Sequence, residues 1–420
     1  MFDFKKLHVD NTPVFFQKLP SVVNPVCLSW TVFVGSADDG YVGQPGLYHW
    51  FEHVPFRGTK RYPDGNRQID EFLGRYGGGV NATTGHVTTS FDVQVPKRLW
   101  KTGLNMLTDL VAHPLLRPKD VEAERKIVQE ENNEIHSSAA KHADDELFSV
   151  IWPGHPLAHS VGGKNSDIRK MDAGLLKKAH EWGYSDGRLA FFAAGDLLEK
   201  DLLRSVERAL KKMPYRAISS RRETAYYGAI RWERGFHLIP TMFDSSVIFM
   251  LFPMPPRHQD LDRSARYFIA REMFFAGGVS SPIEKITRVD RNLVYAVHPY
   301  VATYADGGAW GFVTETSPGN ESKVIKAFWD TIRSKEVRSK ARYAYVKDSL
   351  RADIEMDVPH PARMVSAAQR AYAAHSKILS DKEWLDVVAR WPKNRVNDVI
   401  DSMVPDNAKI VIFKGKGRKK

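Results

Sequence analysis

The stretch His49-Trp50-Phe51-Glu52-His53 places two candidate metal ligands and a candidate base within about one helical turn. Histidines at positions i and i+4 lie about 40° apart around a helix, so both imidazoles can reach one ion on the same face. Glu52 directly precedes the second histidine, where it can hold and deprotonate a water on the metal. The order H-x-x-E-H reverses the H-E-x-x-H zinc motif and is the inverzincin pattern. In a chain with 15 histidines such a pattern can also arise by chance, so the flanking sequence has to decide.

A third ligand is expected on the acidic segment 120–135, which contains no glycine or proline and is helical in character. A catalytic zinc usually takes three protein ligands and keeps a fourth position open. Glu124 and Glu131 are seven residues apart and therefore share one face of this helix, two turns from each other. The same side carries the apolar residues Ile127, Val128 and Ile135. Carboxylates that bracket an apolar stripe are hard to explain as solvated surface, so both are candidates for the metal centre.

Several further segments extend the pattern in a fixed order. They are Gly35-Ser36, Gly46-Leu47-Tyr48, Phe56-Arg57-Gly58-Thr59, Tyr62-Pro63, Gly77-Gly78-Gly79-Val80-Asn81-Ala82-Thr83 and Glu124-Arg125-Lys126-Ile127-Val128-Gln129-Glu130-Glu131. With these segments the chain resembles the M16, or pitrilysin-type, zinc metallopeptidases, and in particular the short members related to mitochondrial processing peptidase. The resemblance implies one Zn²⁺ per chain, bound by His49, His53 and Glu131. It further implies that Glu52 is the general base and that Glu124 is a carboxylate behind the ligands.

A second segment, Ser280–Val297, is similar to a C-terminal landmark of the same family. In that landmark an arginine and a tyrosine seven residues apart assist the reaction, and Arg288 and Tyr295 have this spacing. A guanidinium can anchor substrate carbonyl oxygens, and a phenol can donate a hydrogen bond to a developing oxyanion. The segment departs from the family at three positions: Pro282, Val289 and Asn292 replace an arginine, an acidic residue and a glycine.

The glycine cluster at 77–79 predicts a turn that enters a strand containing Asn81 and Ala82. In the family this strand is an exposed sheet edge, to which the substrate adds as an extra β-strand. By that resemblance Asn81 and Ala82 contact the main chain of a peptide substrate. From the residues alone, a turn asparagine after glycines is an equally good interpretation of Asn81.

Composition is that of a globular protein, with 43% hydrophobic and 26% charged residues among 420. The net charge of +11 raises the question of nucleic acid, but basic residues are spread along the chain, and the only tight cluster is at 414–420. We therefore expect no nucleic-acid partner. A single cysteine, Cys27, excludes an intramolecular disulfide framework. No secretory signal opens the sequence and no stretch of eighteen apolar residues occurs, so we expect a cytoplasmic protein without membrane contact.

The sequence also repeats one arrangement of elements. A strand (28–34; 246–252), a helix, a glycine cluster, an alternating strand (88–95; 309–316) and a long helix (98–112; 321–334) follow one another in both halves. We predict an α+β fold of two homologous α/β-sandwich domains from an internal duplication, each an antiparallel-rich sheet covered by helices. The first domain is 1–213 and binds the metal, 214–222 is a linker, and 223–420 is the second domain with the Arg288/Tyr295 pair.

The resemblance also carries an expectation about assembly and function. Short members of the family pair two subunits around a chamber, and this chain contains both sets of functional residues. We therefore expect a homodimer, with a heterodimer with a homologous subunit as the alternative. The predicted function is zinc-dependent endopeptidase cleavage of unstructured peptides. The alternatives are a non-catalytic or partner-dependent subunit with a scaffold role and, on charge alone, a nucleic-acid binder.

Overall fold

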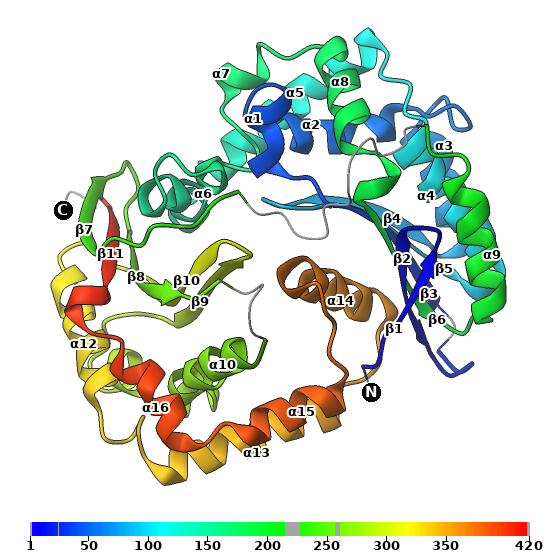
Figure 1. The fold of residues 1–420 in the computed structure, drawn as a ribbon. Helices are drawn as coiled ribbons and strands as arrows, with labels where there is room; N and C mark the ends of the chain where they lie inside the picture. Colours follow the sequence, from blue (N-terminus) through cyan, green and yellow to red (C-terminus); the bar gives the residue numbers. More distant parts are fainter. Residues whose placement is uncertain (1, 24, 215–226, 257–260, 418–420) are drawn as a thin grey trace. The chain divides into compact units, whose positions relative to one another are not determined.

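The structure, a computed structural model, describes residues 2–23, 25–214, 227–256 and 261–417. Contacts divide the chain into two compact units (Figure 1). Unit 1 comprises 1–133, 159–225 and 358–380, and unit 2 comprises 134–158, 226–357 and 381–420. The units are thus discontinuous in sequence, because two short segments pack with the opposite half of the chain. The predicted linker lies outside the described residues, apart from Pro214, and the boundaries 1–213 and 223–420 stay a prediction.

Unit 1 is built on a six-stranded sheet with the order β1-β2-β6-β3-β5-β4. Its strands are β1 (Lys5–Val9), β2 (Thr12–Lys18), β3 (Pro25–Val32), β4 (Gly79–Thr84), β5 (Thr89–Pro96) and β6 (Leu189–Gly195). Strands β2 and β6 are parallel, and all other neighbours are antiparallel. Strand β4 lies at one edge, so its outer backbone groups have no strand neighbour among the described residues.

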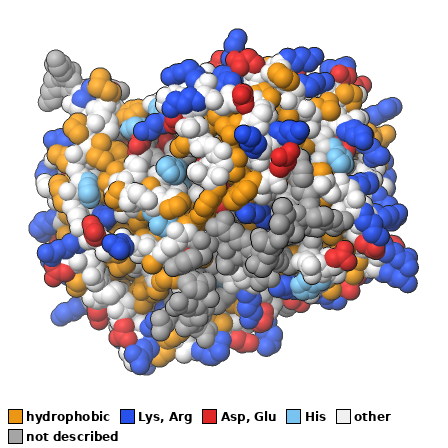
Figure 2. Space-filling model, turned by 45° about the horizontal axis from the view of Figure 1, so that its top comes forward, with side chains coloured by type: hydrophobic (Ala, Val, Ile, Leu, Met, Phe, Trp, Pro, Cys, Tyr) orange, Lys and Arg blue, Asp and Glu red, His pale blue; other side chains and the backbone are white. Residues whose placement is uncertain are grey.

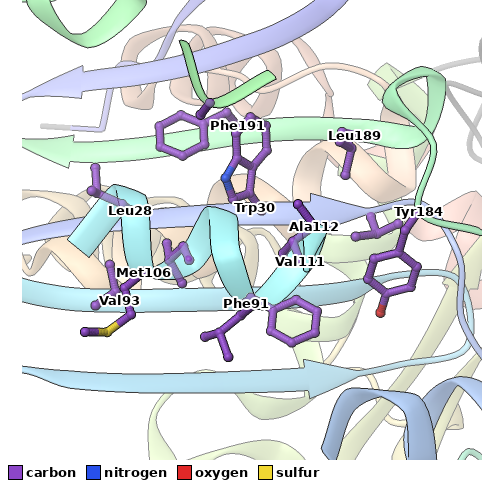
Figure 3. Close-up of a cluster of buried hydrophobic side chains, with 14 of the residues drawn as sticks. Leu28, Trp30, Phe91, Val93, Met106, Val111, Ala112, Tyr184, Leu189 and Phe191 are labelled. Atoms are coloured by element: carbon purple, nitrogen blue, oxygen red, sulfur yellow. The ribbon is translucent and has the colours of Figure 1, made fainter. Parts of the chain in front are cut away.

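The core of unit 1 lies between this sheet and helix α4 (Trp100–Ala112). Trp30 and Phe191 meet edge to face, and Phe91, Met106 and Val111 close around them (Figure 3). All five side chains are fully buried. The indole of Trp30 donates a hydrogen bond to the Thr108 hydroxyl at 3.3 Å, which satisfies its one polar atom. Because this sheet and helix pack closely, the segments that connect their ends start from well-defined positions.

Unit 2 repeats the sheet of unit 1 without its first strand. The order is β7-β11-β8-β10-β9, with β7 (Gly235–Pro240), β8 (Ser246–Met254), β9 (Val297–Tyr304), β10 (Gly307–Thr316) and β11 (Lys409–Lys414). Position by position this matches β2-β6-β3-β5-β4, and each pair of neighbours has the same direction, including the single parallel pair β7–β11. The predicted fold class is confirmed, and the matching order is the structural sign of the duplication.

Two equivalent helices each pack with the other half's sheet. Helix α6 (Ala139–Ile151), from the first half of the sequence, packs on β8 and β11 of unit 2. Helix α14 (Pro361–His375), from the second half, packs on β3 and β6 of unit 1. Because α14 and α4 contact opposite faces, β3 and β6 are buried along almost their whole length, unlike the alternating β4.

The remaining helices complete the two units. They are α1 (Asp39–Val42), α2 (Leu47–His53), α3 (Asn66–Tyr76), α5 (Pro118–Ile135), α7 (Asn165–Ile168), α8 (Ala173–Gly183), α9 (Glu199–Leu210), α10 (Leu261–Phe275), α11 (Pro282–Glu284), α12 (Glu321–Arg333), α13 (Lys340–Met356), α15 (Asp381–Arg390) and α16 (Lys393–Asp401). In the described parts of the chain, none of these helices has the length and apolar character needed to cross a membrane. On the face shown in Figure 2, lysine and arginine side chains are scattered among acidic ones.

Candidate metal centre

Helix α2 carries the H-x-x-E-H residues, and its start is fixed by a buried carboxylate. Asp39 accepts hydrogen bonds from the backbone N–H groups of Gly46 (2.7 Å) and Tyr48 (3.0 Å), which would otherwise be unpaired at the helix N-terminus. Burial raises the pKa of Asp39 well above its usual range, although these backbone donors act in the opposite direction. Trp50 and Phe51 are fully buried and anchor the inner face of the helix. The helix is therefore held firmly at its start and along one side.

The opposite side of α2 brings both histidines to helix α5. The Nε2 atoms of His49 and His53 lie 3.8 and 3.4 Å from Oε2 of Glu131. One ligand atom from each of the three residues can be chosen so that all lie within 4.8 Å of one another. Two imidazoles and one carboxylate are a donor set that zinc takes in catalytic sites. The predicted ligands are thus brought together, and the residues present fit a zinc ion.

Glu124 lies behind the candidate ligands, next to His53. Its Oε1 is 3.0 Å from Nδ1 of His53, and its Oε2 accepts a hydrogen bond from the Arg57 guanidinium. A partner on Nδ1 fixes the ring orientation and leaves Nε2 to face the metal, as carboxylate–histidine pairs do in zinc sites. His49 differs, because its Nδ1 is buried without a hydrogen-bond partner among the described residues. The two histidines are therefore supported unequally.

The charges of the cluster follow from this arrangement. Burial alone would lower the pKa of His53, but hydrogen bonds to Glu124 and Glu131 outweigh it and raise the pKa to about 9. Burial, together with the neighbouring His53, lowers the pKa of His49 to about 4. The hydrogen bond from His53 is the main cause that lowers the pKa of Glu131. The metal-free cluster thus holds one proton near neutral pH, on His53, where an incoming cation would displace it.

Glu52 has the environment of a base. Its side chain is 9% exposed, and burial raises its pKa, while a hydrogen bond from Thr84 at the end of β4 acts against that rise. A raised pKa makes a carboxylate a stronger base toward a water proton. Glu52 is also close enough to His53 and Glu131 to feel both charges. It therefore lies beside the candidate ligands His53 and Glu131.

A cleft of about 920 Å³ opens beside these residues within unit 1. Glu52 and His53 line it together with Asn81 and Ala82 from the edge strand β4. Asn81 is exposed and Ala82 half-buried, so this edge strand is accessible from the cleft. One sequence expectation needs correction here. Ile127, predicted in the apolar stripe of α5, is 43% exposed and lines this cleft, because only Val128 of that pair turns into the core.

Arg288 and Tyr295 lie in unit 2, at a separate cleft of about 930 Å³. The guanidinium of Arg288 is 5.0 Å from the centre of the Tyr295 ring, and Tyr295 is 84% exposed. The unusual residues around them fit the local backbone. Asn292 has a left-handed φ of 48°, which asparagine tolerates better than most residues, and Pro282 is the first residue of α11, where no amide donor is needed.

Several supporting residues escaped the sequence reasoning. Arg57 was quoted as part of a motif, but its contact with Glu124 spans 67 positions and has no local signal. The same holds for Thr84 beside Glu52, whereas Asp39 below α2 was missed although its partners lie only seven and nine residues further on. The identity of a buried partner across the fold depends on packing that periodicity does not report.

Comparisons with known proteins show the family of the chain. Residues 25–165 match the family model "Insulinase (Peptidase family M16)", and residues 170–348 match "Peptidase M16 inactive domain". An uncharacterized zinc protease of Rickettsia felis is 22% identical over 381 residues, covering 90% of this chain and 89% of that protein. The mitochondrial-processing peptidase subunit beta of Blastocladiella emersonii is 21% identical over 355 residues. The match covers 80% of this chain and 73% of that protein.

Among solved structures, a peptidase M16 inactive domain from Pseudomonas fluorescens superposes with a TM-score of 0.85 at 15% identity, with complete coverage of both chains. A fold of two duplicated sheets, with a His-His-Glu cluster in the first, defines a zinc-peptidase-like class of protein. This chain belongs to peptidase family M16, in its two-domain form.

Proposed function

We propose that the chain is a zinc-dependent endopeptidase that hydrolyses unstructured peptides, with Glu52 as general base. The convergence of His49, His53 and Glu131 beside the buried Glu52 carries this proposal. The names of the relatives, zinc protease and mitochondrial-processing peptidase, support the same chemistry. A zinc ion bound there supplies a Lewis acid that polarises a peptide carbonyl and acidifies a water.

The chain's own residues perform the remaining steps. Glu52 takes a proton from the attacking water and passes it to the leaving amine. The Glu124 carboxylate keeps His53 oriented while charge changes around it. The edge of β4, with Asn81 and Ala82, offers backbone groups to which a peptide in extended conformation adds as a strand. Such recognition reads the main chain more than the side chains, so broad sequence tolerance is expected.

Arg288 and Tyr295 are assigned the roles that the family resemblance implies. Tyr295 donates a hydrogen bond to the oxyanion and Arg288 holds substrate carbonyl oxygens. The exposure of Tyr295 leaves its hydroxyl accessible to a substrate. We further propose that two copies pair as a homodimer, with a heterodimer as the alternative that sedimentation of the purified chain would separate.

The test is cleavage of a quenched fluorescent peptide library by wild type, Glu52→Gln and the control Glu130→Gln, with zinc measured on all three. Glu130 is an exposed neighbour of Glu131 on α5, so its loss should change nothing. Cleavage by wild type and the control, with a zinc-loaded but inactive Glu52→Gln, is the expected result. Zinc binding without any cleavage would favour a partner-dependent subunit. Absence of both would contradict the proposal and favour a scaffold role.

A further inference from the structure

Asn132 directly follows the ligand Glu131, yet it points into the protein interior. Its side chain is 4% exposed, and its Nδ2 lies 3.2 Å from each of three oxygens: the carbonyls of Gly162 and Gly163 and the side-chain oxygen of Asn165. One side-chain amide thus ties the end of α5 to the loop before α7. A buried amide with this many acceptors is costly to replace, because the carbonyls would lose their donor.

The loop residues 162 and 163 in turn pack on the start of α2. A Cβ atom on Gly46 would lie 2.5 Å from the Gly162 carbonyl oxygen, and one on Gly163 would lie 2.2 Å from the Pro45 carbonyl oxygen. Both glycines have left-handed φ values, 90° for Gly46 and 64° for Gly163. Backbone therefore touches backbone here, three residues before His49. The approach is possible only because no side chain intervenes.

On its other side the loop is equally close to Asn132 itself. A Cβ on Gly162 would lie 2.3 Å from Oδ1 of Asn132, so even a methyl group would displace the Asn132 side-chain amide. The contacts form a continuous path from Glu131 through Asn132 and the two glycines to Gly46 and His49. This path joins the helix that bears the carboxylate ligand to the helix that bears both histidines.

We infer that Asn132 is a positioning residue for the metal centre, and that with Gly162 and Gly163 it sets the separation of α2 and α5. The inference rests on the proposed zinc function and adds the element that fixes its geometry. When α2 and α5 hold the ligands at the correct distance, the ion binds without rearrangement. When the helices are further apart, binding must first bring the ligands together, which costs affinity. Loss of Asn132 should therefore weaken zinc binding although Asn132 touches no metal.

The experiment measures the zinc dissociation constant by competition with a chromophoric chelator, and the melting temperature of the metal-free protein. Asn132→Ala is expected to raise the dissociation constant about tenfold, the range of outer-shell mutations. The matched control Asn133→Ala removes an exposed neighbour that accepts one hydrogen bond from Asn165, and should change the constant less than twofold. The absorption spectrum of the cobalt-substituted protein should shift with Asn132→Ala and not with the control.

A double-mutant cycle tests whether Asn132 and Gly162 affect zinc binding through their mutual contact. Gly162→Ala should weaken zinc binding in the wild-type background and less so in the Asn132→Ala background, because the oxygen that the new methyl meets is then gone. A lower melting temperature with an unchanged zinc constant and cobalt spectrum would reduce Asn132 to a purely structural role and overturn the inference. If Asn132→Ala does not fold, Gly162→Ala and Asn165→Ala decide in its place, and unchanged zinc constants in both would overturn it. A wild type that binds no zinc would instead sink the proposed function.

Discussion

The two units have separate sheets with the same strand order. They differ in the residues carried by one equivalent connection between strands. In unit 1 the connection from β3 to β4 contains α2 with His49, Glu52 and His53. In unit 2 the equivalent connection from β8 to β9 contains α10, α11, Arg288 and Tyr295. Both sets of candidate functional residues thus lie between equivalent strands. The duplicated sheets preserve a scaffold, and the chemistry has diverged in the segments that the scaffold presents.

The difference extends to the helix that packs on each connection. In unit 1, α5 meets α2 through Glu131 and Glu124, which face the two histidines. In unit 2, the corresponding α13 meets the end of α10 through Arg342, whose guanidinium donates to the carbonyls of Glu272, Met273 and Ala276. Unit 1 thus has candidate metal ligands at this helix pair, whereas unit 2 has an arginine that binds the carbonyls at a helix end. Equivalent helix pairs therefore hold candidate metal ligands in unit 1 and hydrogen bonds that stabilise a helix end in unit 2.

The largest effect should follow removal of a ligand. Glu131→Ala leaves two histidines, and we expect zinc affinity to fall by more than the roughly hundredfold upper range of outer-shell mutations, with loss of cleavage. The comparison predicts that bound zinc then falls from one ion per chain to none, since the ligands are all in unit 1. Elemental analysis after dialysis measures this, with Glu130→Ala as control. Retention of one ion by Glu131→Ala would show a site elsewhere and break the comparison.

The pair in unit 2 should affect catalysis and leave the metal in place. Tyr295→Phe removes one hydroxyl from an 84% exposed ring and should lower kcat about 100-fold, as loss of one oxyanion donor does. Zinc content should not change, because Tyr295 lies in unit 2 and the candidate zinc ligands lie in unit 1. Steady-state kinetics and metal analysis separate the two quantities, and Tyr345→Phe, an exposed tyrosine on α13, is the control. An unchanged kcat would remove the pair from the proposed mechanism.

Glu124→Gln should weaken zinc binding about tenfold when measured at pH 9.5, where His53 is largely unprotonated in either protein. The amide still occupies the space beside His53 Nδ1, but it polarises the ring less than a carboxylate does. Glu122→Gln on the exposed face of the same helix is the control. Equal affinities for Glu124→Gln and wild type would leave Glu124 without a role behind the ligands.

The pH dependence of zinc binding follows from the raised pKa of His53. Because this pKa moves from 6.5 to about 9 in the metal-free fold, the protonated ring stabilises the fold fully below pH 6.5, and this stability is lost as the pH rises through about 9. Zinc must displace that proton, so apparent affinity should rise about tenfold per pH unit between 6.5 and 8.5 and level off near 9. Competition titrations test this. In Glu124→Gln the plateau should begin at lower pH, since a cause of the high pKa is gone.

The sequence predicted the scaffold and the grouping of the candidate ligands because both leave local signals. His49, Glu52 and His53 lie within one turn, the two glutamates are two turns apart, and the repeated strands alternate with period two. The packing of α6 on the sheet of unit 2 and of α14 on the sheet of unit 1 has no such signal. The apolar face of a helix shows that the helix packs on a sheet but not which sheet that is. Arg57 and Asn132 have no such signal either, because their partners lie far along the chain. The roles of all the site residues, the homodimer and the cytoplasmic location stay predictions.

The smallest effect on the site should come from Arg342, which lies on the helix of unit 2 that corresponds to α5. Arg342→Met keeps much of the side chain's apolar stem but removes the donors to three carbonyls at the end of α10. Hydrogen bonds from a charged donor contribute about 1.5–3 kcal/mol, so the free energy of unfolding should fall by about 2 kcal/mol. Zinc affinity should stay unchanged, because the change lies outside unit 1. Denaturant unfolding with a parallel zinc titration measures both. A change in zinc affinity would mean that the two units do not divide stability and chemistry as their helix pairs indicate.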